Sequence, residues 1–150
     1  MSGLDDTVMR TVRGAIYAAI VETGAAPGAA DVANAHYLEP RVVAKAYRAL
    51  AASHVIVLQP GTLDVWSAPP FSAVPTAFRV NVGRASWYAP CAWDAFGIPA
   101  AMKRDAIVEG RCAWSGEPIP CGVERGRAYG VGIIHLLVAA AQFWDDIVYT

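Results

Sequence analysis

The sequence has little charge and no long uninterrupted apolar run. Charged side chains make up only 17% of its 150 residues and hydrophobic ones 55%, which excludes a disordered chain and supplies material for a core. Because no uncharged apolar run reaches about 18 residues, we expect no membrane-spanning helix. The formal net charge of −1 excludes a global basic field that would attract nucleic acid or an anionic membrane.

Cysteine is also scarce. The three cysteines, Cys91, Cys112 and Cys121, leave at least one thiol unpaired. The N-terminal stretch MSGLDDTVMR lacks the apolar core behind a basic start that marks a signal peptide. These features predict a cytoplasmic, reducing location, in which thiols are free for chemistry.

Motifs for metals and nucleotides are missing. Neither Cys112 nor Cys121 has a CxxC partner, and the chain contains no GxGxxG or GKS/GKT loop. We therefore expect no cofactor. The histidines add little: His36 and His54 are expected at the surface, and His135, within GIIHLLV, in an apolar core.

Residues 1–67 show the pattern of three helices followed by a two-stranded hairpin. In the first helix, Val12, Ile16 and Ile20 recur at helical spacing. Two β-rich runs in HVIVLQPGTLDVWS flank Pro60-Gly61, which is a hairpin signal. The helices are predicted over 6–22, 29–36 and 40–53. This order is that of a winged-helix-like domain.

In a DNA-binding winged helix, the third helix would be the recognition helix. Here that helix carries Arg41, Lys45 and Arg48, but the hairpin carries Asp64 and no lysine or arginine. The weak electrostatic attraction disfavours DNA contact. Packing or dimerisation stays open as the role of this module.

The rest of the chain predicts a small sheet domain. Residues 68–78 hold three prolines and read as a linker arm, and residues 79–150 form the core domain. A hairpin around Gly83-Arg84, a helix over 92–103 and a strand over 106–113 are predicted first. Then follow a loop over 115–126, a strand over 131–139, a helical turn over 140–145 and a strand from Ile147. The fold class is α+β, with a mixed or antiparallel sheet.

The last predicted strand, which begins at Ile147, would leave an exposed edge. We expect this edge to be completed by a partner subunit, by a bound segment or by an unusually short sheet, so a homodimer is one of the expected arrangements.

The stretch YAPCAWDAFGIPA places Cys91 and Asp94 three residues apart in an apolar, aromatic setting. At the start of a helix, free N–H groups and the helix dipole favour a thiolate at Cys91. Asp94 would lie one turn later, and two negative charges in an apolar pocket are costly. A single shared proton resolves this conflict and gives a nucleophile or soft-metal ligand beside a proton donor.

Structural alternatives to this interpretation stay open. A free cysteine often behaves as a small buried hydrophobe, and aspartate is an ordinary capping residue in the first turn of a helix. The neighbouring aromatic side chains line a substrate pocket or belong to the core; they are Trp87, Tyr88, Trp93 and Phe96.

The segment ASWYAPCAWDAFGIPAAM resembles the active-site segment of the alkylmercury lyase family. DAIVEGRCAWSGEPI and GIIHLLVAAAQFWDDIVYT resemble later segments of that family. The resemblance implies that Cys91 takes mercury as a thiolate, that Asp94 protonates the leaving carbon and that Cys112 is structural. The family's second catalytic cysteine would fall at or next to the end of FWDDIVYT, where Thr150 stands. Cys121 is the other candidate thiol ligand for mercury.

Three functions follow. The first is cleavage of a carbon–mercury bond in an organometal substrate. The second is acid–base or covalent chemistry by Cys91 and Asp94 on another small organic molecule, within the same fold. The third is a non-enzymatic winged-helix regulator or metal sensor, in which Cys91 and Cys121 report thiol-reactive ligands.

Overall fold

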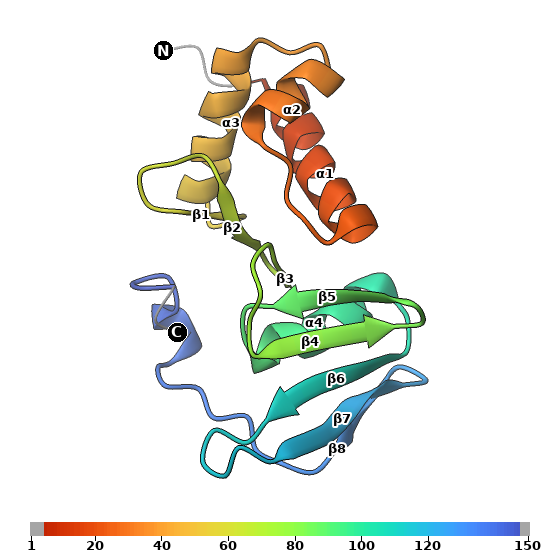
Figure 1. Cartoon of the computed structure of the whole chain (residues 1–150). Coiled ribbons are helices and arrows are strands. Elements are labelled where there is room, and N and C mark those ends of the chain that lie inside the picture. The colour runs from red at the N-terminus through yellow and green to blue at the C-terminus, as the bar shows by residue number, and fades with distance from the viewer. Residues whose placement is uncertain (1–4, 148–150) are drawn as a thin grey trace. The chain divides into compact units, whose positions relative to one another are not determined.

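A computed structural model describes residues 5–147 of the chain. The chain forms two compact units, Met1–Ala68 and Pro69–Thr150, each of which is considered by itself (Figure 1). In the described part of the chain, none of the helices has the length and apolar character needed to cross a membrane.

The first unit contains three helices and a short antiparallel hairpin, in the predicted order. The carboxylate of Asp5 caps the first helix by accepting the backbone N–H of Thr7 at 3.0 Å. Pro40 begins the third helix, where a missing N–H costs nothing. The elements are α1 (Asp6–Thr23), α2 (Ala29–Ala35), α3 (Pro40–Ala52), β1 (Val57–Leu58) and β2 (Val65–Ala68).

The apolar stripes of α1 and α3 supply the core of the first unit. Their buried residues are Val12, Ile16, Ile20, Val43, Ala46, Tyr47 and Leu50. The Tyr47 hydroxyl donates to the carbonyl of Pro27 at 3.0 Å, and burial, followed by the charge of Asp31, raises the pKa of Tyr47 to about 12. The cations of α3, namely Arg41, Lys45 and Arg48, are exposed, as are His36 and His54. The expectation that this unit is a poor DNA binder stays a prediction.

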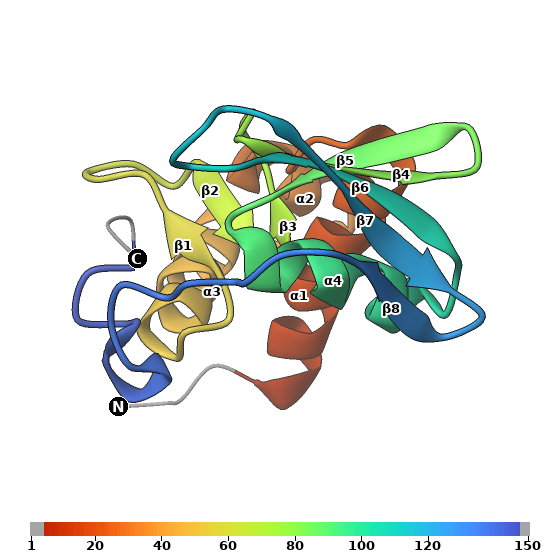
Figure 2. The same ribbon diagram turned by 90° about the horizontal axis from the view of Figure 1, so that it is seen from below.

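The second unit is an antiparallel sheet with one helix, so the fold class is α+β, as predicted. The strands of this unit lie in the order β3-β5-β4-β6-β7-β8. Helix α4 packs against β4, β5 and β6 (Figure 2). The elements are β3 (Phe71–Ser72), β4 (Phe78–Val82), β5 (Ala85–Ala89), α4 (Ala92–Met102), β6 (Ala106–Arg111), β7 (Pro118–Glu124), β8 (Arg127–Gly130) and a 3₁₀ turn (Ala140–Gln142).

The strand register divides the side chains of this sheet between two faces. Val80 pairs with both Trp87 and Val108, and all three side chains are buried. Paired residues point to the same face, so these three lie on the side that α4 covers. The residues next to them along each strand point to the other face of the sheet. Ile107, the neighbour of Val108, is 59% exposed there. Within residues 69–147, helix α4 therefore packs against one face of the sheet, and Ile107 lies on the other face.

Two strand predictions were wrong. The stretch predicted as a loop over 115–126 contains β7, although it includes Pro118 and Pro120. Strand β8 pairs only with Cys121–Glu124, so both prolines lie beyond its end, where β7 has a neighbour on one side only. A missing N–H is tolerated there.

The stretch predicted as a strand over 131–139 is irregular. Gly130 and Gly132 adopt φ angles of 129° and 151°, and the ladder ends at Gly130. His135, predicted in the core, is exposed, and Ile133 is 94% exposed. Of the strand predicted from Ile147, Ile147 itself lies in a turn, and residues 148–150 lie outside the described residues, so the homodimer stays a prediction.

Residues 68–78, predicted as a linker arm, contribute a strand to the second unit. Phe71 and Ser72 are buried, and Ser72 pairs with Tyr88 of β5. Pro70 lies against α4: a Cβ atom added to Gly97 would be 3.0 Å from the Cβ of Pro70. Glycine at position 97 therefore allows the helix to approach this segment closely.

Two helical glycines should respond to alanine in opposite directions. Gly14 of α1 has open space around its missing Cβ, so Gly14→Ala is expected to raise the free energy of unfolding by about 0.5–1 kcal/mol. Gly97→Ala forces a methyl group against the rigid ring of Pro70 and should lower the free energy of unfolding by about 1 kcal/mol. Urea unfolding of both variants tests this pair, and equal gains in stability would contradict the close approach.

Candidate active site

Cys91 and Asp94 meet at the point where β5 leads into α4. Cys91 is the N-cap of the helix, with extended backbone (φ −146°, ψ 176°), and Asp94 lies in the first turn. The Cys91 thiol donates to Oδ2 of Asp94, with a distance of 3.4 Å between the sulfur and that oxygen. Both side chains are half-buried. The structure thus brings together the two residues singled out by spacing.

The surroundings keep a proton in this pair. Burial raises the pKa of the Cys91 thiol, and the charge and hydrogen bond of Asp94 raise it further, whereas backbone N–H groups of Asp94 and Trp93 lower it. Burial also raises the pKa of the Asp94 carboxyl, partly offset by the hydrogen bond from Cys91. The helix start favours the thiolate, but desolvation outweighs it, so ionising both groups is costly.

The four aromatic residues proposed to line a pocket do not lie together. Trp87 is buried on the α4 face, and its ring meets that of Phe71 edge-on, with centroids 6.2 Å apart and an interplanar angle of 66°. Tyr88, the next residue of β5, points to the opposite face. Trp93 is 65% exposed, and Phe96 is half-buried.

Phe71 was not predicted as part of this region. Its position in a proline-rich stretch favoured a linker, and only the pairing of β3 with β5 places it beside Trp87.

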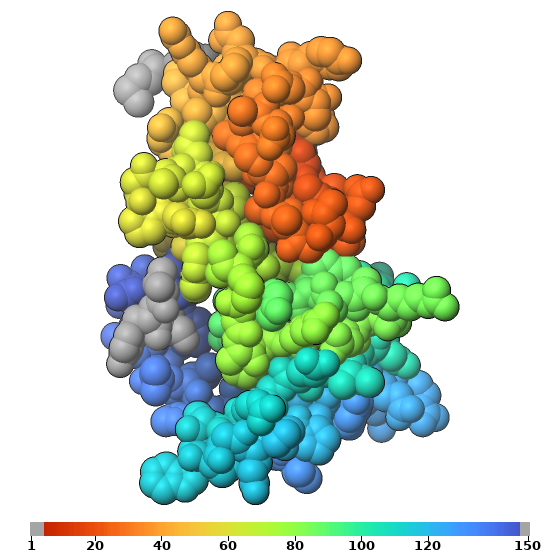
Figure 3. All heavy atoms as spheres, in the orientation of Figure 1, coloured from red at the N-terminus to blue at the C-terminus, as the bar shows by residue number. Residues whose placement is uncertain are grey.

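Cys112 lies in the loop between β6 and β7, which is cyan in Figure 3 and projects from the second unit. Hydrogen bonds from the backbone and side chain of Ser115, and from the backbone of Trp114, lower the pKa of the Cys112 thiol. The Trp114 side chain is 97% exposed. This thiol therefore lies in an open loop, unlike that of Cys91.

Cys121 lies on β7 and is half-buried. Its thiol donates to the carbonyl of Val108 at 3.8 Å, and burial raises its pKa. Within residues 5–147, no three His, Cys, Asp or Glu side chains form a group able to hold a metal ion. Cys121 therefore does not join Cys91 and Asp94 in a site with three such ligands.

The three thiols should react with an alkylating reagent in a definite order. Because the thiolate is the nucleophile, the lowered pKa of Cys112 gives it the largest thiolate fraction at pH 8. Because the pKa values of Cys91 and Cys121 are raised, these two thiols should react at about one tenth of the rate of Cys112 or at a still lower rate. Peptide-resolved mass spectrometry after iodoacetamide treatment measures these rates, and fastest modification of Cys91 would contradict the described burial.

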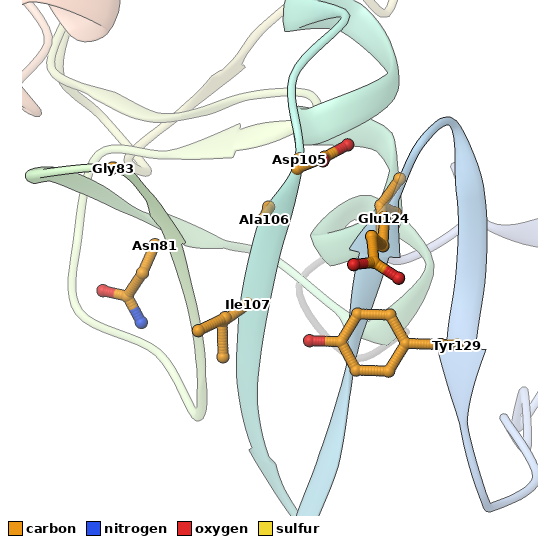
Figure 4. A pocket seen from close by; sticks show the side chains of 8 residues that line it. Asn81, Gly83, Asp105, Ala106, Ile107, Glu124 and Tyr129 are labelled. Atoms are coloured by element: carbon orange, nitrogen blue, oxygen red, sulfur yellow. The ribbon is translucent and has the colours of Figure 1, made fainter.

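A surface hollow of about 520 Å³ lies on the sheet face away from α4 (Figure 4). In this view the Tyr129 ring lies below the carboxylate of Glu124, and its hydroxyl is on the side of Ile107. Its lining residues are Asn81, Gly83, Asp105, Ala106, Ile107, Val123, Glu124 and Tyr129. Neither Cys91 nor Asp94 contributes to it, so this hollow is separate from the thiol–carboxyl pair.

Comparison with known proteins places this chain in a family. The alkylmercury lyase family profile matches residues 71–147, which is just over half of the chain and includes Cys91 and Asp94. The chain belongs to the alkylmercury lyase family. No curated protein matches the chain.

One solved structure extends the likeness of this alkylmercury lyase family member beyond the matched residues. The crystal structure of the mercury-bound form of MerB2 has a TM-score of 0.64 and 23% sequence identity, over 84% of this chain. At this identity the likeness shows the fold. The chain spans 60% of the length of that protein.

Proposed function

We propose that this chain cleaves the carbon–mercury bond of organomercurial compounds, with Cys91 as the mercury ligand and Asp94 as the proton donor. The single observation that carries the proposal is the 3.4 Å contact between the Cys91 sulfur and the Asp94 carboxylate at the start of α4. Membership of the alkylmercury lyase family supports the choice of substrate class.

The first step is thiol exchange at mercury. Asp94 accepts the proton of the Cys91 thiol, and the thiolate displaces the anionic ligand from the organomercurial. Mercury is a soft metal that favours thiolate ligands, so the new sulfur–mercury bond drives this step. The raised pKa of Asp94 suits it to hold the proton that it has received.

The second step is protonolysis. The Asp94 carboxyl gives its proton to the carbon bound to mercury, and the electron pair of the carbon–mercury bond becomes the new carbon–hydrogen bond. A hydrocarbon leaves, Asp94 is again a carboxylate, and Hg(II) stays on the Cys91 sulfur. Two thiols from solution then remove mercury as a dithiolate: one of their protons returns to Cys91, and the other is released.

The partly apolar surroundings contribute to both steps. Ala95, Ile98 and Pro99 of α4 are buried, and the carboxyl group beside them is partly shielded from water. In such a place the proton and the carbon–mercury dipole interact more strongly than they would in bulk water. Cys91 is half-buried, so the residue as a whole is not fully enclosed by the protein.

The test is to incubate the purified chain with an organomercurial and excess thiol, and to measure the released hydrocarbon by gas chromatography. In deuterated water the product should carry a single deuterium on the carbon that was bound to mercury. Mercury binding without hydrocarbon release would support a metal-sensing role for Cys91 in place of catalysis.

A further inference from the structure

The segment that carries Cys91 is tied to the preceding hairpin by the side chain of Thr76. The Thr76 hydroxyl donates to the carbonyl of Ala89 at 2.6 Å, with the Phe78 carbonyl a second acceptor at 3.2 Å. The same oxygen accepts the backbone N–H of Phe78 at 3.2 Å. Phe78 and Ala89 are the last register pair of β4 and β5, so the hydroxyl bridges the open end of the hairpin.

Only Pro90 separates this bridge from Cys91. The proline ring fixes its own φ angle, so few backbone torsions remain free between the Ala89 carbonyl and the thiol. On the other side, the Cys91 carbonyl accepts the N–H of Ala95 at 3.0 Å within α4. Cys91 is thus held from both directions, by the Thr76 bridge before it and by the helix after it.

We propose that Thr76 is a positioning residue, whose hydroxyl holds the Cys91 thiol against the Asp94 carboxylate by fixing the Ala89 carbonyl. Its effect on turnover rests on the proposed function, whereas its effect on the thiol does not. Thr76 is half-buried and lies outside the helix that carries the pair. The hydrogen bonds of its hydroxyl described above are to backbone groups of Phe78 and Ala89, so the hydroxyl acts on Cys91 through the backbone.

The experiment compares Thr76→Val, which keeps the side-chain shape but loses the hydroxyl, with Thr76→Ser, which keeps the hydroxyl. The rate of Cys91 alkylation by iodoacetamide is measured against pH, with Cys112 as an internal reference. In Thr76→Val the Cys91 thiol should move away from the Asp94 carboxylate. The thiol should then titrate at lower pH and react about threefold faster near neutral pH. Thr76→Ser should behave like the original chain.

A second comparison separates positioning from general loosening. In an Asp94→Asn background, Thr76→Val should leave the titration of Cys91 unchanged, because the contact with a charged partner is already gone. Loosening of the domain would raise the reactivity of Cys91 in both backgrounds. Three results would overturn the proposal. The first is that Thr76→Val shifts the titration of Cys91 equally with and without Asp94, and the second is that Thr76→Ser shifts it as much as Thr76→Val does. The third is that Thr76→Val leaves the titration of Cys91 unchanged.

Folding is checked by near-ultraviolet circular dichroism. If Thr76→Val does not fold, Thr76→Ala replaces it under the same criteria, and failure of both to fold would make the hydroxyl structural and overturn the positioning role. The alkylation assay needs no organomercurial substrate. A chain that releases no hydrocarbon but shows the coupling to Asp94 would contradict the proposed function and leave the role of Thr76 intact.

Discussion

Cys91→Ser is expected to reduce hydrocarbon release from an organomercurial to the uncatalysed level. A serine hydroxyl does not ionise at neutral pH and is a poor ligand for soft mercury, so both the capture step and the protonolysis that follows it are lost. Gas chromatography measures the hydrocarbon, and equilibrium dialysis measures bound mercury. The exchange of sulfur for oxygen is small at this half-buried position, so the fold should persist.

Cys121→Ser is the matched control for this variant. Cys121 is also a half-buried thiol with a raised pKa, but it lies on β7, and its thiol donates to the carbonyl of Val108 instead of to Asp94. Its replacement should keep most of the rate of hydrocarbon release. Equal loss in the two variants would mean that both thiols hold mercury, and an active Cys91→Ser would remove Cys91 from the reaction.

Asp94→Asn is expected to keep mercury binding at equilibrium, with the Cys91 proton passing to solvent, but to slow hydrocarbon release by about 10²–10⁴-fold. An amide keeps the size of the side chain but does not deliver a proton to carbon, and general acids contribute about this factor. Single-turnover measurements separate the two steps, because the thiolate–mercury complex should accumulate in the variant. Asp64→Asn, at an exposed position in the first unit, is the control and should be fully active.

The same substitution should affect stability in a pH-dependent way. Burial raises the pKa of folded Asp94 above its unfolded value, so the carboxyl favours folding below the unfolded pKa and loses this contribution as pH rises through the folded pKa. Asp94→Asn carries no charge, so its stability relative to the original chain should be higher at pH 7 than at pH 3. A pH-independent difference would contradict the burial of the carboxyl.

Local patterns in the sequence determined the helices and the pair of reactive residues. Apolar spacing and capping residues placed the described helices to within a residue or two, because helical periodicity is a local property. Cys91 and Asp94 were also predictable, since a contact between residues three apart in a first helical turn needs no distant partner. Resemblance to the alkylmercury lyase family drew on the same segment, which lies within the matched residues.

Tertiary structure alone decided which strands pair and what surrounds the site. The strand β7 was missed because its prolines are tolerated only where β8 ends, which is a property of the neighbour and not of β7 itself. An apolar run over 131–139 predicted a strand, but pairing depends on a partner, and this run has no strand in the described structure. Likewise, only the strand register separates Trp87 from Tyr88, and only the folded hairpin brings Thr76 to Ala89. These contacts join residues distant in sequence. The pKa values of Cys91 and Asp94 are likewise raised mainly by burial, which depends on how the folded chain packs.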